Sequence, residues 1–168
     1  MEGGLPSVIE LEALIRVVEP RDLREVYEVE SLSFTGNITY DFSVFLLYYA
    51  MARDLFLVAE ALGKVIGYII GLIELRRREV LGHVISIAVH PLYRGLGIGS
   101  KLLKALEEKL ASRGALRIFL EVDVLNKSAI GFYKKHGYVV SGVLKNYYGV
   151  SDAYVMVKEV KAALRQFK

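Results

Sequence analysis

The chain has 168 residues, of which 54% are hydrophobic and 24% charged, and its formal net charge is +3. This composition is typical of a globular domain rather than a disordered chain, and the length is about that of one domain with a sizeable core. The small basic excess suits an anionic small molecule and is too small to indicate nucleic-acid binding. Because the sequence contains no cysteine, it excludes a disulfide framework, a thiolate metal site and a cysteine nucleophile.

The chain divides into a loose lead-in at residues 1–12, one domain at 13–160 and an uninformative tail at 161–168. The lead-in lacks the basic and long apolar regions of a signal peptide. No segment approaches the roughly 18 consecutive apolar residues of a membrane span. We therefore expect a cytoplasmic protein that does not act at a membrane, and we expect no bound metal.

The first third of the domain predicts a strand and two helices. Residues 13–20 predict a strand that ends at Pro20, and apolar residues at helical spacing predict a helix over 21–34. After a loop, a very apolar helix is expected over 41–54, with Asp41 as its N-cap. We expect this apolar helix to be mostly core.

The hydrophobic period then changes to that of strands. Residues 55–61 and 65–75 flank a Leu-Gly-Lys turn and predict a hairpin. Residues 76–82 predict a second turn, and 83–89 a third strand. The basic run Arg76–Arg78 predicts a solvated turn, with a docking patch for the ribosome or another acidic partner as the alternative.

The second half alternates helices and strands. The expected elements are a helix at 100–113 with one leucine stripe, a strand at 116–124, a short helix at 126–137 and closing strands at 138–144 and 152–160. The chain therefore predicts a single α+β domain, with a mixed, mostly antiparallel sheet of about seven strands flanked by about four helices. The helical crossover between 83–89 and 116–124 predicts one parallel pairing.

Three glycines, Gly95, Gly97 and Gly99, lie together where the third strand passes into the next helix. A helix N-terminus has unpaired N–H donors and the positive end of its dipole, and glycine lets a ligand approach the backbone closely. With Arg94 as a cation, the segment predicts a pyrophosphate cradle. It does not fit the P-loop or the dinucleotide fingerprint, since Ser100 follows the last glycine where those motifs need other residues. The alternative is a glycine-rich turn without a ligand.

Two motifs resemble one family. "RGLGIG" (residues 94–99) is similar to the Q/R-x-x-G-x-G/A acetyl-CoA motif of the GNAT N-acetyltransferase superfamily. "NKSAIGFYKKHGY" (126–138) resembles that family's later N-x-x-A-x-x-F-Y-x-x-x-G-F element, with Tyr138 in place of the last Phe. The resemblance covers residues 14–160. The strand and turn sequences, with "VLKNYYGVSDAYVM", are most similar to the RimI-type and archaeal protein N-terminal acetyltransferases.

The resemblance implies acetyl-CoA as co-substrate. In that family the edge of strand 83–89 pairs with the pantetheine, the glycine-rich turn holds the pyrophosphate, and Asn126 and Tyr133 lie beside the thioester, with the Tyr133 hydroxyl serving the sulfur. The alternatives are a plain N-cap for Asn126 and a core tyrosine for Tyr133. The implied cofactor-binding residues are Ile87, Ala88, Val89, Arg94, Gly95, Leu96, Gly97, Ile98, Gly99, Ser100, Asn126 and Tyr133.

Two residues are candidates for deprotonating the acceptor amine. Glu121 stands in the middle of an apolar strand, where a carboxylate is costly unless it is paired or functional. His83 begins the neighbouring expected strand, and a parallel pairing would let both side chains face the amine. The resemblance implies catalytic roles for both, together with Tyr133. The alternatives are a salt bridge from Glu121 to Arg117 or a lysine, and a surface position at the strand start for His83.

The resemblance also implies two walls for the acceptor. Tyr147 and Tyr148 would hold the first backbone residues of the substrate, with an aromatic pair covering the core as the alternative. The loop that ends at Tyr40 would form the other wall. Related catalytic subunits often carry Pro-Glu-Asn-Tyr there, whereas this chain has Thr35–Ile38 and no acidic residue.

The sequence therefore predicts an enzyme that acetylates protein N-terminal α-amines directly, in a ternary complex with acetyl-CoA. Its partners would be protein or peptide N-termini, with the ribosome nearby. The alternatives are acetylation of lysine side chains or small amines, and a non-catalytic module that binds CoA or a nucleotide.

Overall fold

The structure is a computed structural model that describes residues 11–34, 39–149 and 151–160. Most of the expected lead-in, the tail and four residues of the expected acceptor loop, 35–38, lie outside the described residues. Within them the elements are β1 (Leu14–Val17), α1 (Leu23–Ser33), α2 (Phe42–Ala52), β2 (Phe56–Ala61), β3 (Lys64–Arg76), β4 (Glu79–Val89), α3 (Ile98–Ser112), β5 (Arg117–Asp123), α4 (Lys127–Lys135), β6 (Val139–Leu144) and β7 (Ala153–Glu159).

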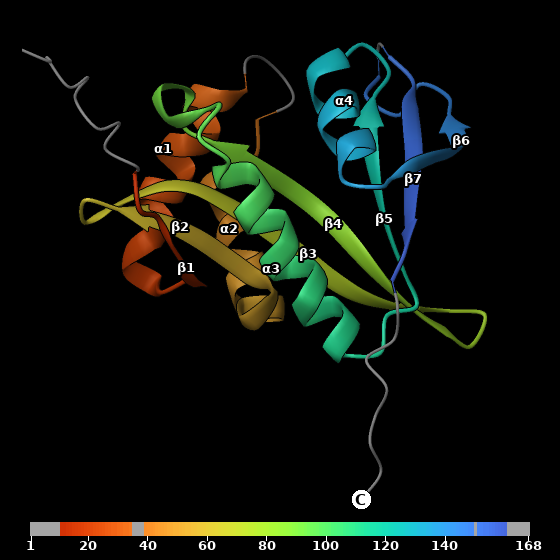
Figure 1. Ribbon diagram of the computed structural model, residues 1–168, viewed down its shortest axis with the longest axis horizontal. Helices are drawn as coiled ribbons and strands as arrows, with labels where there is room; N and C mark the ends of the chain where they lie inside the picture. Colours follow the sequence, from red (N-terminus) through yellow and green to blue (C-terminus); the bar gives the residue numbers. More distant parts are fainter. Residues whose placement is uncertain (1–10, 35–38, 150, 161–168) are drawn as a thin grey trace, which may run out of the picture.

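The strands form one sheet in the order β1-β2-β3-β4-β5-β7-β6 (Figure 1). Every neighbouring pair is antiparallel except β4 and β5, which run parallel on either side of the α3 crossover. The predicted class, the mostly antiparallel sheet and its single parallel pair are therefore confirmed.

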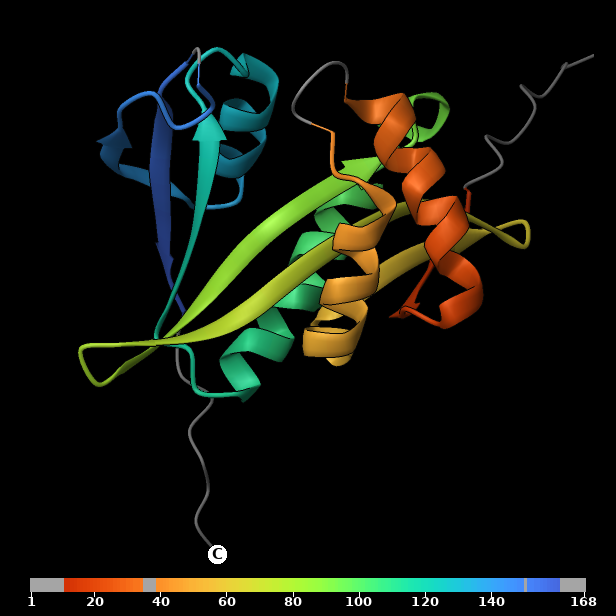
Figure 2. The same ribbon diagram turned by 180° about the vertical axis from the view of Figure 1, so that it is seen from behind.

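The helices lie on both faces of the sheet. Helices α3 and α4 cover the face nearer the viewer in Figure 1, and α1 and α2 cover the face seen in Figure 2. The predicted leucine stripe of α3 is fully buried. A Cβ at Gly71 or Gly82 would come within 2.7 Å or 2.8 Å of leucine side chains of α3, so glycines on β3 and β4 allow this helix to pack closely. No helix in the described ranges is long and apolar enough to cross a membrane.

Helix α2 differs from its expected environment. Phe45 and Ala52 are its buried residues, whereas Leu46, Leu47 and Met51 are about half exposed or more. The expectation that this helix is mostly core is wrong, because the helix is apolar on all sides but only one side packs on α1 and the sheet. Asp41 occupies the N-cap position, but its side chain makes no capping hydrogen bond.

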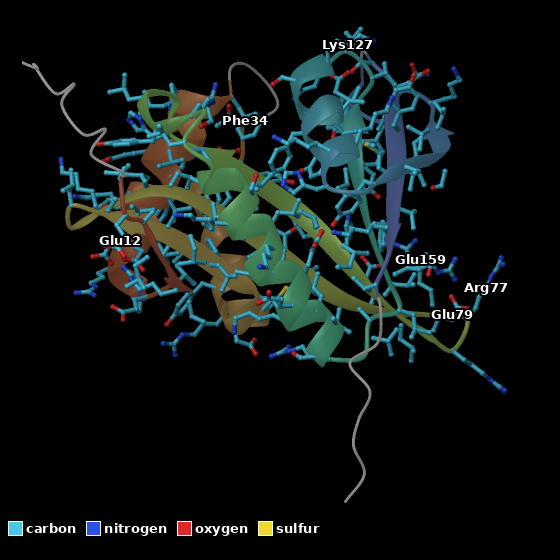
Figure 3. The ribbon with its side chains drawn as sticks, viewed as in Figure 1. Glu12, Phe34, Arg77, Glu79, Lys127 and Glu159 are labelled. Carbon is cyan, nitrogen blue, oxygen red and sulfur yellow. The ribbon has the colours of Figure 1, made fainter. Side chains whose placement is uncertain are left out.

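The turn between β3 and β4 is shorter than predicted. It consists of Arg77 and Arg78, both with positive φ (49° and 69°), as in two-residue hairpin turns whose twist matches that of the strands. The expected seven-residue turn is therefore wrong, and β4 begins at Glu79. His83 consequently lies inside a strand rather than at its start. Figure 3 shows Arg77 at the tip of this projecting hairpin.

Strands β4 and β5 pair over a short stretch and then separate. Leu81–His83 pairs with Arg117–Phe119, and beyond this point the two strands diverge (Figures 1 and 2). An irregularity in the β3–β4 register leaves Ile85 without a partner on β3, and such bulges bend a strand. On the side that faces β5, residues 84–89 have no strand partner among the described residues.

Candidate active site

Three side chains from three neighbouring strands meet where β4 and β5 begin to diverge. His83 of β4 contacts Glu121 of β5 through Nε2 and Oε2, at 2.7 Å. Its other ring nitrogen, Nδ1, lies 2.6 Å from Oε1 of Glu74 on β3. The predicted meeting of His83 and Glu121 is confirmed. Glu74 was not predicted, although it carries the same signal as Glu121, a carboxylate in an apolar strand.

Phe119 and Arg76 also contact the cluster of His83, Glu74 and Glu121. The His83 ring stacks on Phe119, with centroids 4.1 Å apart. The Arg76 guanidinium lies over the same phenyl ring at 4.8 Å, and its Nε donates to Glu74 at 2.7 Å. Only 14% of the His83 side chain and 15% of the Glu121 side chain are exposed, so His83 is not a surface residue. Packing and hydrogen bonds therefore fix the imidazole on three sides.

The hydrogen bonds determine the charge of His83. Two carboxylate oxygens face its two nitrogens, and carboxylates accept hydrogen bonds, so both nitrogens donate only in the imidazolium form. Burial alone lowers the pKa of His83, but the hydrogen bonds and charges of Glu121 and Glu74 outweigh it and raise the pKa above its ordinary value. Burial likewise raises the pKa of Glu74, but His83 and Arg76 lower it overall.

Glu121 therefore pairs with the histidine and not with Arg117. The Arg117 guanidinium is paired with Glu79 instead. The second oxygen of Glu121, Oε1, makes no hydrogen bond within the described residues.

Tyrosines from two loops and a helix surround this end of the sheet. Burial, followed by nearby charges that include Glu121, raises the pKa values of Tyr40 and Tyr148 to about 12 and raises that of Tyr147. The rings of Tyr147 and Tyr148 are perpendicular, with centroids 5.0 Å apart. The structure thus brings the three predicted acceptor residues to the same place. Tyr48 of α2 also raises the pKa values of Tyr40 and Tyr147, and the sequence offered no signal for it beyond an apolar helix.

Helix α4 carries the two residues predicted beside the thioester. The Asn126 side chain accepts a hydrogen bond from the Ala129 N–H at 3.0 Å, so it is the N-cap of α4. Tyr133 is 7% exposed and packs against Tyr138 in the core. Burial, and then the charge of Tyr148, raises the pKa of Tyr133, and its hydroxyl makes no hydrogen bond within the described residues. Contacts of both residues with a cofactor stay predictions.

The backbone of the glycine-rich turn adopts conformations that favour glycine. Gly95 and Gly97 have φ values of +78° and +77°, and a Cβ at either would meet no atom within 4 Å. Helix α3 begins at Ile98 without a side-chain cap, so the N–H groups of its first turn are open to a ligand. Arg94 is exposed and donates from Nε to the Val89 carbonyl at 3.0 Å. This tether holds the guanidinium beside the end of β4.

The two halves of the predicted site border the same divergence. Ser33, at the end of α1, donates from its hydroxyl to the Val89 carbonyl at 3.3 Å. Figure 3 shows the next residue, Phe34, on the β4 side of the divergence and Lys127 of α4 on the β5 side. Among the residues that the structure describes, no group of three or more His, Cys, Asp or Glu side chains is arranged to hold a metal ion. The side chains at the divergence include the Glu121 carboxylate, held by His83.

Known proteins resemble this chain in sequence and structure. Residues 23–138 match the model of the acetyltransferase (GNAT) family. An N-alpha-acetyltransferase of Sulfurisphaera tokodaii is 39% identical over 152 residues, which cover 84% of this chain and 90% of that protein. Ard1 of Thermoplasma volcanium superposes with a TM-score of 0.80 at 32% identity, over 89% of this chain and 98% of that one. Naa20 of Chaetomium thermophilum, in complex with a bisubstrate analogue, superposes with a TM-score of 0.79 at 31% identity, over 92% of this chain and 90% of that one.

Proposed function

This chain belongs to the acetyltransferase (GNAT) family and is an N-acetyltransferase, and from that premise we propose that it transfers the acetyl group of acetyl-CoA to the N-terminal α-amine of proteins. The observation that carries this proposal is the Glu74–His83–Glu121 cluster, which lies where β4 and β5 diverge and is surrounded by tyrosines. An α-amine has an ordinary pKa of about 7.7–8.0, so a carboxylate gives sufficient help, whereas a lysine at about 10.4 needs more. The N-alpha-acetyltransferase relative supports the same acceptor.

The edge of β4 and the start of α3 suit acetyl-CoA. The backbone groups of Ile87–Val89 that face β5 have no strand partner among the described residues. The Val89 carbonyl already accepts from Ser33 and Arg94, so the other groups of this edge are the ones available to an extended pantetheine arm. The open N–H groups at Gly97–Ser100 and the dipole of α3 favour a pyrophosphate. A β4 N–H directed at the thioester oxygen would stabilise the negative charge that develops there.

Glu121 accepts the proton of the attacking amine. As the nitrogen bonds to the carbonyl carbon it becomes positively charged and far more acidic, so a carboxylate is a sufficient base at this stage. His83 holds Oε2 of Glu121 and leaves Oε1 for the amine. Glu74 acts through His83, since it holds the other ring nitrogen.

Tyr133 donates to the leaving sulfur. When the carbon–sulfur bond breaks, the sulfur takes the electron pair and the phenol supplies its proton. Burial keeps the phenol protonated at neutral pH because it raises the pKa of Tyr133. Tyr40, Tyr147 and Tyr148 hold the first residues of the acceptor on either side. A cytoplasmic location and proximity to the ribosome stay predictions.

Two peptides test the acceptor. One has a free N-terminus and no lysine; the other is blocked at its N-terminus and carries an internal lysine. We expect the first to be acetylated much faster, as followed by mass spectrometry at neutral pH. Faster reaction of the blocked lysine peptide would replace the proposal with lysine acetylation. Reaction of neither peptide, with turnover of a small amine, would indicate a small-molecule acetyltransferase.

A further inference from the structure

A buried carboxylate, Glu30, holds the backbone of the proposed acceptor wall at Tyr40. Glu30 of α1 is 1% exposed, and no cation among the described residues pairs with it. Its Oε1 accepts the backbone N–H of Tyr40 at 3.0 Å. Its Oε2 accepts the hydroxyl of Tyr68, on β3. Burial of a carboxylate without a counter-ion is costly, so these two hydrogen bonds are what holds it there.

The hydrogen bonds continue from Glu30 to β4. Tyr68 has one hydroxyl hydrogen, and it is donated to Glu30, so the hydroxyl of Ser86, 3.0 Å away, donates to Tyr68. Ser86 directly follows the unpaired Ile85, at the bend where β4 leaves β5. It also directly precedes the Ile87–Val89 edge.

We propose that Glu30 is a positioning residue that holds the acceptor wall at Tyr40 in register with the acetyl-CoA edge of β4. This inference rests on the proposed function. One oxygen of Glu30 holds the backbone of the acceptor wall, and the other is connected through Tyr68 to the bend of β4. The two substrates would bind on different segments of the chain, and Glu30 fixes the distance between those segments. A displaced wall would hold the acceptor less tightly in the position that it needs for attack.

Glu30→Gln tests the proposal with little change in shape. A glutamine keeps one oxygen to accept from the Tyr40 N–H, but it removes the negative charge that strengthens both hydrogen bonds. Its NH2 group can only donate to Tyr68, so the hydrogen bonds from Tyr68 to Ser86 must reverse direction. Steady-state kinetics with a peptide acceptor, and calorimetry with acetyl-CoA, are the measurements. We expect the peptide KM to rise about tenfold or more, while the Kd of acetyl-CoA changes less than about threefold. If Glu30 had a purely structural role, its replacement would weaken the binding of the peptide and of acetyl-CoA to the same extent.

Tyr68→Phe is the second variant, because it keeps Glu30 on Tyr40 but cuts the connection to Ser86. We expect the peptide KM of this variant to rise too, but only about threefold. Glu107→Gln is the matched control. Glu107 also accepts from a tyrosine hydroxyl, that of Tyr138 at 2.9 Å, but it lies on α3, on the other face of the sheet. This variant should keep the wild-type peptide KM.

The outcomes separate the two proposals. An active wild type whose Tyr68→Phe and Glu30→Gln variants keep the wild-type peptide KM overturns the role of Glu30 and leaves the proposed function standing. Equal loss of peptide and acetyl-CoA binding also overturns it. If Glu30→Gln does not fold, the peptide KM of Tyr68→Phe alone tests the role of Glu30. A wild type that does not acetylate peptide N-termini overturns the proposed function, and the inference with it.

Discussion

His83 lies between two carboxylates, and this position decides its charge. Because Glu74 and Glu121 both accept from its ring, the imidazolium is the favoured form. This form fits the proposal that His83 holds Glu121 and does not itself take the proton. A group whose pKa is raised on folding stabilises the fold below its unfolded pKa of about 6.5, and this contribution is lost as the pH rises through the raised value.

The charge of His83 can be measured directly. In a titration followed by NMR of the side-chain nitrogens, we expect His83 to titrate above 6.5 in the wild type. Glu74→Gln removes one of the two negative charges, so the midpoint should fall. A wild-type midpoint at or below 6.5 would contradict the imidazolium assignment.

Replacement of the base should affect turnover more than binding. Glu121→Gln should lower kcat about 100- to 1000-fold at neutral pH, in line with general-base contributions of roughly 10²–10⁴. The defect should shrink as the pH rises, because hydroxide then takes the proton of the attacking nitrogen in place of the carboxylate. The measurement is a pH–rate profile on the free peptide, with Glu79→Gln as a control outside the site. An unchanged kcat at neutral pH would contradict the assignment of Glu121 as the base.

The body of helix α3 packs in the core, and its first turn belongs to the proposed cofactor site. Its leucines are buried against the sheet, whereas its N-terminus is open at Gly97. The two ends of the helix are matched in backbone strain, since Gly97 and Gly114 have φ values of +77° and +90° and neither has an atom within 4 Å of an added Cβ. A side chain would strain the backbone to a similar extent at both positions, but only at Gly97 would it enter the proposed cofactor site.

This matched pair isolates the role of the turn. Gly97→Val should weaken acetyl-CoA binding at least about tenfold, because the new side chain occupies the space left for the pyrophosphate. Gly114→Val should lower stability to a similar extent, since both force a side chain into the left-handed region, but should keep the wild-type affinity. Calorimetry measures the affinity of each variant for acetyl-CoA, and thermal unfolding measures its stability. If both variants bind acetyl-CoA as the wild type does, the cradle lies elsewhere.

At the scale of the whole molecule, the divergence of β4 and β5 places the two proposed substrate sites side by side. The edge of β4 and the start of α3 face one substrate, and the Tyr40 and Tyr147 segments face the other. The chain has no cysteine to carry an acetyl group. With the two proposed sites adjacent, the reaction does not require a covalent acetyl-enzyme intermediate.

Transfer should therefore be direct. Initial rates measured over a grid of both substrate concentrations should give intersecting lines in double-reciprocal plots. Mass spectrometry of enzyme incubated with acetyl-CoA alone should find no acetylated active-site residue. Parallel lines, together with an acetyl-enzyme that passes its group to the peptide, would show a two-step mechanism instead.

The sequence by itself determined the order of the elements, the hairpins, the buried leucine stripe of α3, the glycine-rich turn before that helix and the place of a carboxylate, Glu121, in an apolar strand. Each is a local signal: a hydrophobic period, a turn residue, or a charge in an apolar strand. The tertiary structure alone decided that Glu74 completes the cluster, that Glu30 lies under Tyr40, and that α2 is largely exposed. These depend on strand register and on which face of a helix finds a partner, and contacts between distant segments leave no mark in the local pattern of either segment.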